Sequence, residues 1–205
     1  MLPQGIPGNG DKDRVWFGRH KLDSQGTYLV QGASGRGKST FLHLILGIRR
    51  DYGGQILFDE EDIRAFNNNQ WAAIRRETFA MVFQDLRLLG EITAIENLLL
   101  KARLVEDSQS NRIEELAGGL DIREQLNKPC HKLSHGQQQR LAILRALLQP
   151  FRILLLDEPF SHLDPDITQT CLNLIQQTCQ KRNAGMILAT HDNDYGLDYD
   201  KKLLV

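Results

Sequence analysis

A glycine-rich stretch near the start of the chain has the spacing of a phosphate-binding loop. Residues 32–39 read Gly-Ala-Ser-Gly-Arg-Gly-Lys-Ser, which fits the pattern G-x-x-x-x-G-K-[ST]. Glycines let the backbone wrap phosphates and point N–H groups at them, and a following helix directs its positive end at the same charge. We expect Lys38 to reach the β- and γ-phosphates of a nucleotide and the Ser39 hydroxyl to bind Mg²⁺. The expected loop residues are Gly32, Ala33, Ser34, Gly35, Arg36, Gly37, Lys38, Ser39 and Thr40.

Two adjacent carboxylates follow an apolar run later in the chain. Residues 153–156 are Ile-Leu-Leu-Leu and lead into Asp157, Glu158 and Pro159. Such a run is typical of a central parallel strand covered on both faces, which argues against a simple polar turn. Because neighbouring strand residues point to opposite faces, the two carboxylates are expected to diverge. Asp157 would then serve Mg²⁺, directly or through water, while Glu158 stands near an attacking water.

A phosphate-binding loop alone is compatible with kinases, GTPases, motors and transporter ATPases, so further stretches are needed to decide among these classes of protein. Gln84 and His191 each follow a short apolar run. Between them, residues 133–140 read Leu-Ser-His-Gly-Gln-Gln-Gln-Arg. This stretch resembles the LSGGQ signature of ATP-binding cassette (ABC) ATPases. Together with the loop and the carboxylates, these motifs occur in that family's order, so the chain is identified as a member of it.

The resemblance implies roles for single residues within one chain. Gln84 resembles the Q-loop glutamine, which touches Mg²⁺ and the attacking water and lies where a transmembrane partner docks. His191 resembles the switch histidine, which contacts the γ-phosphate. The implied reaction is in-line attack by water on the γ-phosphate of ATP, with Glu158 as general base or water-orienting group, helped by His191. The catalytic residues would be Glu158, His191, Lys38 and Gln84, and the Mg²⁺ ligands Ser39, Gln84 and Asp157.

The resemblance also implies a second cassette, either a copy of this chain or a related one. Ser134, Gly136 and Gln137 begin a helix, and in the family this helix start binds the γ-phosphate held by the opposite subunit. Residues 161–164 resemble the D-loop, which crosses the dimer interface. Asp164 before Pro165 is equally an ordinary N-cap with proline at the first helical position, and both interpretations can hold together.

The chain departs from the family pattern at two places. His135 stands where the signature motif usually has a glycine, and its imidazole could crowd the opposing nucleotide or point away and add a polar contact. Upstream, where the family presents an aromatic residue that stacks on adenine, residues 6–10 are rich in Pro and Gly. The nearest aromatic residues, Trp16 and Phe17, suggest a strand packed in the core.

The pattern of elements predicts an α/β fold: a P-loop NTPase with a RecA-like, mainly parallel sheet, a small antiparallel β subdomain and a helical signature subdomain. The 205 residues suit one domain, 1–205, with the helical subdomain inserted at about 86–149. The predicted strands are 27–30, 55–58, 79–83, 153–156 and 186–189. The predicted helices are 38–48, 69–76 and 165–182, with helical pattern also over 92–148. The first ten residues are predicted to be irregular, 51–54 a turn, and 106–111 a loop or helix start.

Composition excludes some classes of protein. A net charge of -1 provides no basic field, so no nucleic-acid partner is expected. No apolar run has the length of a membrane-spanning helix, since Arg140 and Arg145 interrupt the leucine-rich stretch. The three cysteines lack metal-site spacing, and Cys171 and Cys179 fit an apolar helix face. With no secretory signal in its first residues, the chain is expected to be cytoplasmic and peripheral on the inner face of the membrane.

The leading hypothesis is an ATP-binding subunit that hydrolyses ATP to drive a separate transmembrane permease. Residues 82–97 are similar to members that serve lipoprotein release, macrolide efflux or cell-division complexes. A soluble ABC ATPase without a membrane partner is the alternative, but neither sustained heptads nor a second cassette is present to support it. A nucleotide-binding scaffold without activity is disfavoured because Lys38, Asp157, Glu158 and His191 are all present.

Overall fold

The computed structural model describes residues 2–3, 15–102, 109–191 and 193–205. Its main sheet is parallel throughout and has the strand order β6-β7-β8-β2-β9. The strands are β2 (Thr27–Gln31), β6 (Phe79–Val82), β7 (Ile153–Asp157), β8 (Gly185–Thr190) and β9 (Lys201–Leu204). The predicted parallel core is confirmed, although β9 was not predicted because its two leucines form too short an apolar run.

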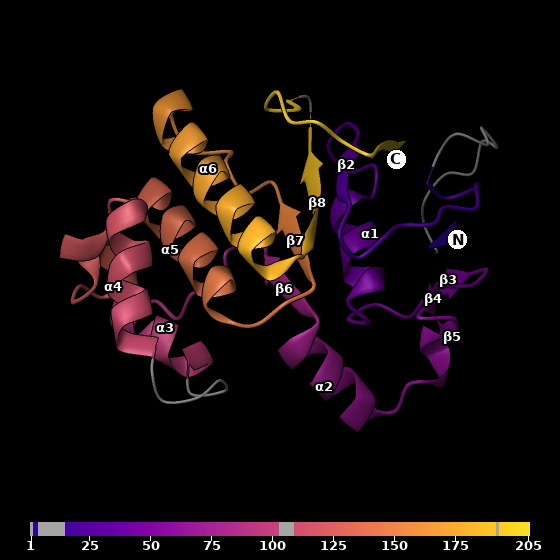
Figure 1. Cartoon of the computed structure of the whole chain (residues 1–205), viewed down its shortest axis with the longest axis horizontal. Helices are drawn as coiled ribbons and strands as arrows, with labels where there is room; N and C mark the ends of the chain where they lie inside the picture. Colours follow the sequence, from indigo (N-terminus) through magenta and orange to yellow (C-terminus); the bar gives the residue numbers. More distant parts are fainter. Residues whose placement is uncertain (1, 4–14, 103–108, 192) are drawn as a thin grey trace.

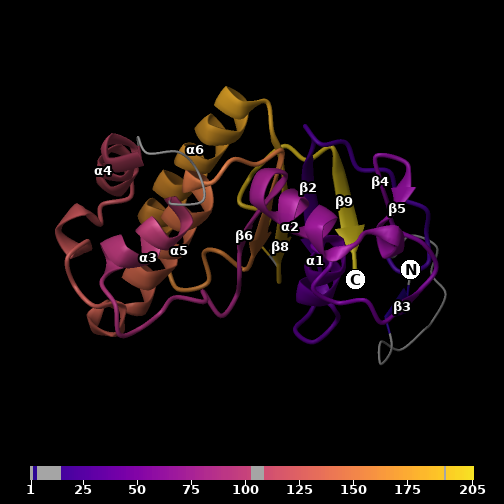
Figure 2. The same cartoon turned by 90° about the horizontal axis from the view of Figure 1, so that it is seen from below.

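Helices cover both faces of this sheet, which explains why its strands are apolar without alternation. Leu154 and Leu156 of β7 pack in a cluster with helices α5 (His135–Leu148) and α6 (Pro165–Arg182). Leu155 points to the other face and packs in a cluster with α1 (Lys38–Ile45). Figure 1 and Figure 2 both show α1 on one side of the strands and α5 and α6 on the other. The loops that follow β2 and β7 therefore extend from a core in which the sheet lies between two layers of helices.

The helical region packs around α5 at one end of the molecule (Figure 2). Helices α3 (Ala94–Ala102) and α4 (Gln109–Gly119) contact α5, and short 3-10 turns at Arg123–Gln125 and Cys130–Lys132 lead back to it. Of residues 106–111, predicted as a loop or helix start, 106–108 lie outside the described residues, and α4 begins at Gln109. This region corresponds to the predicted helical insertion.

Small antiparallel pairs lie at the opposite end (Figure 2). β1 (Leu2–Pro3) pairs with β3 (Tyr52–Gly53), and β4 (Leu57–Phe58) pairs with β5 (Glu61–Asp62). A 3-10 turn (Ile63–Ala65) and α2 (Asn68–Glu77) then return the chain to β6. The predictions of an irregular start and of a turn over 51–54 were wrong at these pairs. Proline is compatible with an edge strand, and pairing with a distant segment overrides local propensity.

Trp16 and Phe17 lie in a turn, so the predicted strand there was wrong. Trp16 is nevertheless buried and packs edge to face on Phe41 of α1, with ring centroids 6.0 Å apart. This packing accounts for its burial. The sequence lacks the family's adenine-stacking aromatic residue near residues 6–10, and these residues lie outside the described part of the chain. Helix α1 also ends earlier than predicted, at Ile45, because Gly47 adopts a left-handed φ of 65°.

The interior contains the cysteines as small apolar residues. Cys130, Cys171 and Cys179 are free thiols and buried, as predicted for the two on α6. Burial raises the pKa of Cys171 to about 12 and that of Cys179 to about 11, so both stay protonated at neutral pH. None of the helices in the described part of the chain is both long enough and apolar enough to cross a membrane.

Candidate active site

The glycine-rich loop joins the carboxyl end of β2 to the amino end of α1. Gly37 caps α1 with φ 107°, a conformation that favours glycine. At Gly32, an added Cβ would lie 2.5 Å from Val205 Cγ2, so only glycine permits this approach to the chain beside β9. Residues 33–36 are exposed. The loop thus presents backbone N–H groups and the positive end of α1 to solvent, as an anion site requires.

Lys38 lies buried under this loop. Its ammonium donates hydrogen bonds to Gly32 O at 2.8 Å and Ala33 O at 3.4 Å, and lies 3.1 Å from Glu158 Oε1. The side chain of Lys38 is only 5% exposed, so the strength of these contacts is little reduced by solvent. A phosphate bound in the loop would compete with the Glu158 carboxylate for this ammonium. Lys38 therefore links the loop to the carboxylates at the end of β7.

Oxygen ligands suited to Mg²⁺ meet beside the loop. Ser39 Oγ donates to Gln84 Oε1 at 3.4 Å, and Asp157 is 1% exposed. Asp157 Oδ1 is buried and has no hydrogen-bond partner among the described residues. Burial raises the pKa of Asp157, while the neighbouring Ser39 hydroxyl opposes this shift. Because a hydroxyl, an amide oxygen and an orphaned carboxylate oxygen converge, the residues fit a hard divalent cation.

A cavity of about 420 Å³ opens at the same place. It is lined by Ser39, His43, Phe83, Gln84, Asp85, Arg87 and Asp157. The structure therefore brings the predicted residues Ser39, Gln84 and Asp157 together around one space. The signature residues Ser134, Gly136 and Gln137 are not part of this lining.

Glu158 is placed by its backbone conformation, which differs from the sequence-based argument. Strand β7 ends at Asp157, and Glu158 has a left-handed φ of 47°. Strand alternation therefore does not set the direction of its side chain, as the sequence had suggested. A hydrogen bond from the Glu158 N–H to Ala189 O at 2.9 Å holds this conformation. Left-handed non-glycine residues are uncommon and gather at functional sites, because surrounding contacts must stabilise them.

Gln139 of α5 connects the segment after Glu158 to the signature helix. Its amide donates to Glu158 O and to Ser161 Oγ, both at 3.2 Å, and its carbonyl accepts from the His162 N–H at 3.1 Å. The side chain is 1% exposed. Sequence reasoning missed Gln139, although a glutamine on the buried face of a predicted helix was a usable signal. These bonds fix residues 158–162 against α5.

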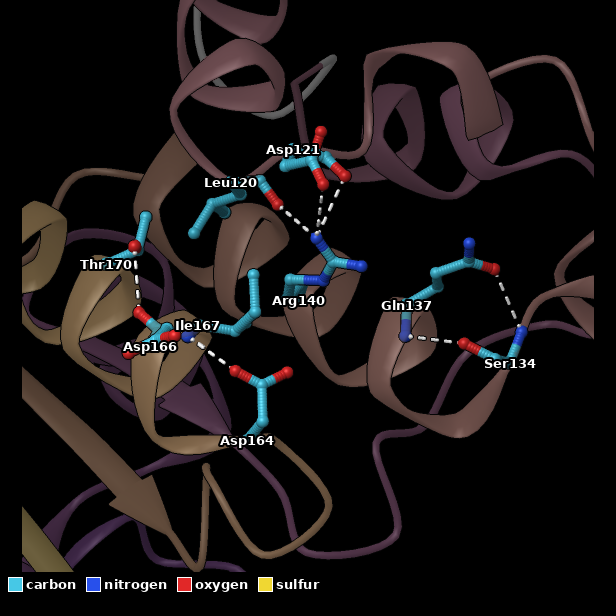
Figure 3. A network of polar contacts seen from close by, with 9 residues as sticks. All are labelled: Leu120, Asp121, Ser134, Gln137, Arg140, Asp164, Asp166, Ile167 and Thr170. Atoms are coloured by element: carbon cyan, nitrogen blue, oxygen red, sulfur yellow. Dashed lines mark hydrogen bonds and ion pairs between the residues drawn. The ribbon is translucent and has the colours of Figure 1, made fainter.

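The signature helix begins in a capping box. Ser134 Oγ accepts from the Gln137 N–H at 3.3 Å, and the Gln137 side chain accepts from the Ser134 N–H at 3.0 Å (Figure 3). A Cβ on Gly136 would lie 3.2 Å from His162 O, which favours glycine there. The predicted residues therefore form a helix start beside His162 and Leu163.

His135 packs within its own chain. Its ring lies against that of His162, with centroids 4.0 Å apart at 45°, and His162 Nδ1 is 2.9 Å from Ser161 Oγ. The sequence left open whether His135 crowds the opposing nucleotide or points away and adds a polar contact. Its ring packs on His162, and its effect on an opposing nucleotide stays a prediction. His191 follows β8 and is exposed. Its predicted role as a switch residue stays a prediction.

Asp164 is the N-cap of α6, with Pro165 at the first helical position. Asp164 Oδ1 accepts from the Ile167 N–H at 2.9 Å (Figure 3). The cap interpretation is confirmed, whereas the role of Asp164 in a dimer interface stays a prediction.

Replacing Asp164 by Ala should lower the stability of the chain by about 1 kcal/mol, because an amide at the start of α6 loses its acceptor. For a chain of this size that corresponds to a fall in melting temperature of roughly 2–4 °C. Thermal unfolding followed by circular dichroism measures this shift. Asp164→Asn keeps an acceptor at the cap and should melt near the wild type. Equal melting of Asp164→Ala and wild type would contradict the capping role.

Comparison with known proteins agrees with this geometry. The family model described as ABC transporter matches residues 19–161. The lipoprotein-releasing system ATP-binding protein LolD of Syntrophotalea carbinolica is 33% identical over 84% of this chain and 77% of its own length. The dimeric bacterial ABC transporter cassette MJ0796 has a TM-score of 0.77 at 27% identity, over 84% of this chain and 78% of that one. A post-hydrolysis dimer of MJ0796 bound to ADP and Pi has a TM-score of 0.74 at 28% identity, over the same shares.

Proposed function

Because the chain belongs to the ABC transporter family and is an ATPase, we propose that it binds MgATP at residues 32–40 and couples the hydrolysis to movement of a separate transmembrane partner. The observation that carries this proposal is the convergence of Lys38, Ser39, Gln84, Asp157 and Glu158. They come from separate segments of the chain, yet they are linked by contacts around one loop and one cavity.

The geometry supports phosphoryl transfer to water. Lys38 and the loop N–H groups would stabilise charge on the β- and γ-phosphates. Glu158 would accept the proton of the attacking water, helped by His191. Ser39, Gln84 and Asp157 would hold Mg²⁺, which when bound neutralises phosphate charge and orients the oxygens. Glu158 and a γ-phosphate would compete for the Lys38 ammonium, so ATP binding would free the carboxylate to act on water.

The site would be completed by a second cassette. Ser134, Gly136 and Gln137 lie outside the lining of the cavity, yet they form a helix start suited to an anion. A head-to-tail dimer would place this helix start against the nucleotide held by the other subunit. The dimeric cassette of MJ0796 supports this arrangement, as either a homodimer or a heterodimer.

The transmembrane partner would place this chain on the cytoplasmic face of the membrane. LolD is named as part of a lipoprotein-releasing system, and another relative, MacB of Nitrosomonas europaea, as a macrolide export ATP-binding/permease protein. These names support a release or export complex. MetN of Vibrio cholerae, named for methionine import, is 36% identical over 83% of this chain, so identity alone does not set the direction.

Hydrolysis as a function of protein concentration tests the proposal. With saturating MgATP, phosphate release per chain should rise with concentration as dimers form, because each site needs both subunits. Addition of EDTA should stop the reaction. A rate per chain that is constant over a hundredfold dilution, while light scattering shows dissociation to monomers, would contradict the shared site. Absence of hydrolysis under all conditions would contradict the whole proposal.

A further inference from the structure

The turn that carries Gln84 is held by a side chain from the signature helix. Arg145 lies in the last turn of α5, and its Nη1 donates to Arg87 O at 2.6 Å. Its Nη2 donates to Leu86 O at 2.5 Å. The planar guanidinium thus binds two successive carbonyls, a geometry that the single ammonium of lysine cannot reproduce.

These carbonyls belong to an unusual stretch of backbone. Leu86 has a φ of 55° and Arg87 a φ of 49°, so two successive non-glycine residues are left-handed. Such residues need external contacts to persist. The Leu86 N–H also donates to Phe83 O at 3.0 Å, which closes the turn around Gln84 and Asp85. Arg145 therefore binds the side of the turn that follows Gln84.

The position of this turn matters because Gln84 meets the nucleotide site. Its Oε1 accepts from Ser39 Oγ, and both line the cavity with Asp157. The other end of α5 is capped by Ser134, in the capping box of the signature motif. One rigid helix of fourteen residues therefore connects the Arg145 hydrogen bonds to the Gln84 turn with the signature residues at its other end.

We propose that Arg145 is a positioning residue for hydrolysis, whose guanidinium fixes the turn at 84–87 to α5 and so sets Gln84 beside Ser39. This inference rests on the proposed function, because it concerns the same site. It adds a residue that is not part of the lining of the cavity around Ser39, Gln84 and Asp157. Burial lowers the pKa of Arg145, because desolvation disfavours the charged guanidinium. The carbonyls of Leu86 and Arg87 supply hydrogen-bond acceptors that offset part of this cost.

Arg145→Lys tests the proposal, and Arg182→Lys is the matched control. Arg182 also donates to two carbonyls, Gln149 O at 2.5 Å and Leu147 O at 3.0 Å, but at a place that does not carry Gln84. We expect Arg145→Lys to lower kcat roughly tenfold, because small misplacement of a site residue is costly in rate. The KM for ATP should stay within about twofold, since the loop and Lys38 are untouched. Arg182→Lys should keep kcat near the wild type.

A double-mutant cycle separates positioning from general destabilisation. If Arg145 acts through Gln84, Arg145→Lys should reduce kcat in the wild type but add little in a Gln84→Ala background. Equal loss in both backgrounds would overturn the proposal, as would an unchanged kcat for Arg145→Lys. If Arg145→Lys does not fold, Arg145→Gln takes its place in the cycle. Failure of both variants to fold, while Arg182→Lys folds, would assign Arg145 to folding and also overturn the proposal.

The outcomes distinguish this inference from the function on which it rests. A wild-type chain that hydrolyses no ATP would contradict the proposed function. A wild-type chain that hydrolyses ATP, together with an additive cycle, would contradict only the role of Arg145.

Discussion

Replacing Glu158 by Gln should reduce steady-state ATP hydrolysis by about 10²- to 10⁴-fold, the usual contribution of a general base. Gln has nearly the same shape as Glu but cannot accept the proton of water. The backbone conformation of Glu158 is held by its N–H bond to Ala189 O and by the bond from Gln139 to its carbonyl, and neither requires the carboxylate. The site should therefore stay assembled while the chemistry stops.

ATP binding should survive this substitution. The Glu158 carboxylate lies 3.1 Å from the Lys38 ammonium, so its neutralisation leaves Lys38 freer to meet phosphate. Phosphate release measures turnover, while equilibrium titration with a fluorescent ATP analogue measures binding. Light scattering with MgATP should show more dimer than for the wild type, because the ATP-bound state is not consumed.

Glu114→Gln is the matched control for Glu158→Gln. Glu114 pairs with Arg123 at 3.2 Å on the surface, where both side chains are more than half exposed. Exposed pairs of this kind contribute little, so turnover and stability should stay near the wild type. Retention of more than about a tenth of the activity by Glu158→Gln would remove Glu158 from the role of base.

Replacing Lys38 by Met should weaken ATP binding by about 10- to 160-fold, equivalent to the roughly 1.5–3 kcal/mol of a hydrogen bond to a charged group. Met keeps much of the buried stem of Lys38 but removes its contacts with Gly32 O and Glu158. Hydrolysis at saturating ATP should fall as well, because charge on the phosphates is no longer stabilised.

Isothermal titration with ATP in the presence of Mg²⁺ measures this loss of affinity. Lys202→Met is the control, because Lys202 lies outside the loop. Its ammonium forms an exposed ion pair with Asp194, with an N···O distance of 2.8 Å. Its affinity for ATP should not change. Lys38→Met also leaves Glu158 without its ammonium partner, so its melting temperature is measured alongside. An unchanged affinity in folded Lys38→Met would show that the loop binds phosphate through its backbone alone.

The local motifs of the site could be predicted from sequence, because each depends on a short stretch of chain. Neighbouring residues are sufficient to identify the glycine loop, the apolar run before Asp157 and the cap residue before Pro165. The parallel core followed from apolar runs without alternation, which indicate strands covered on both faces. Helix α6 was predicted with the same bounds as the structure has, because its cap and its apolar period agree.

Tertiary structure decided what depends on contacts between distant segments. The pairing of Leu2–Pro3 with Tyr52–Gly53 and the position of β9 come from partners far along the chain, so local propensity could not reveal them. The left-handed conformation of Glu158 is likewise held from Ala189. Sequence marked Arg145 only as an interruption of an apolar stretch. Its role as a clamp depends on carbonyls fifty-eight and fifty-nine residues away, which come within reach only when α5 packs beside the Gln84 turn.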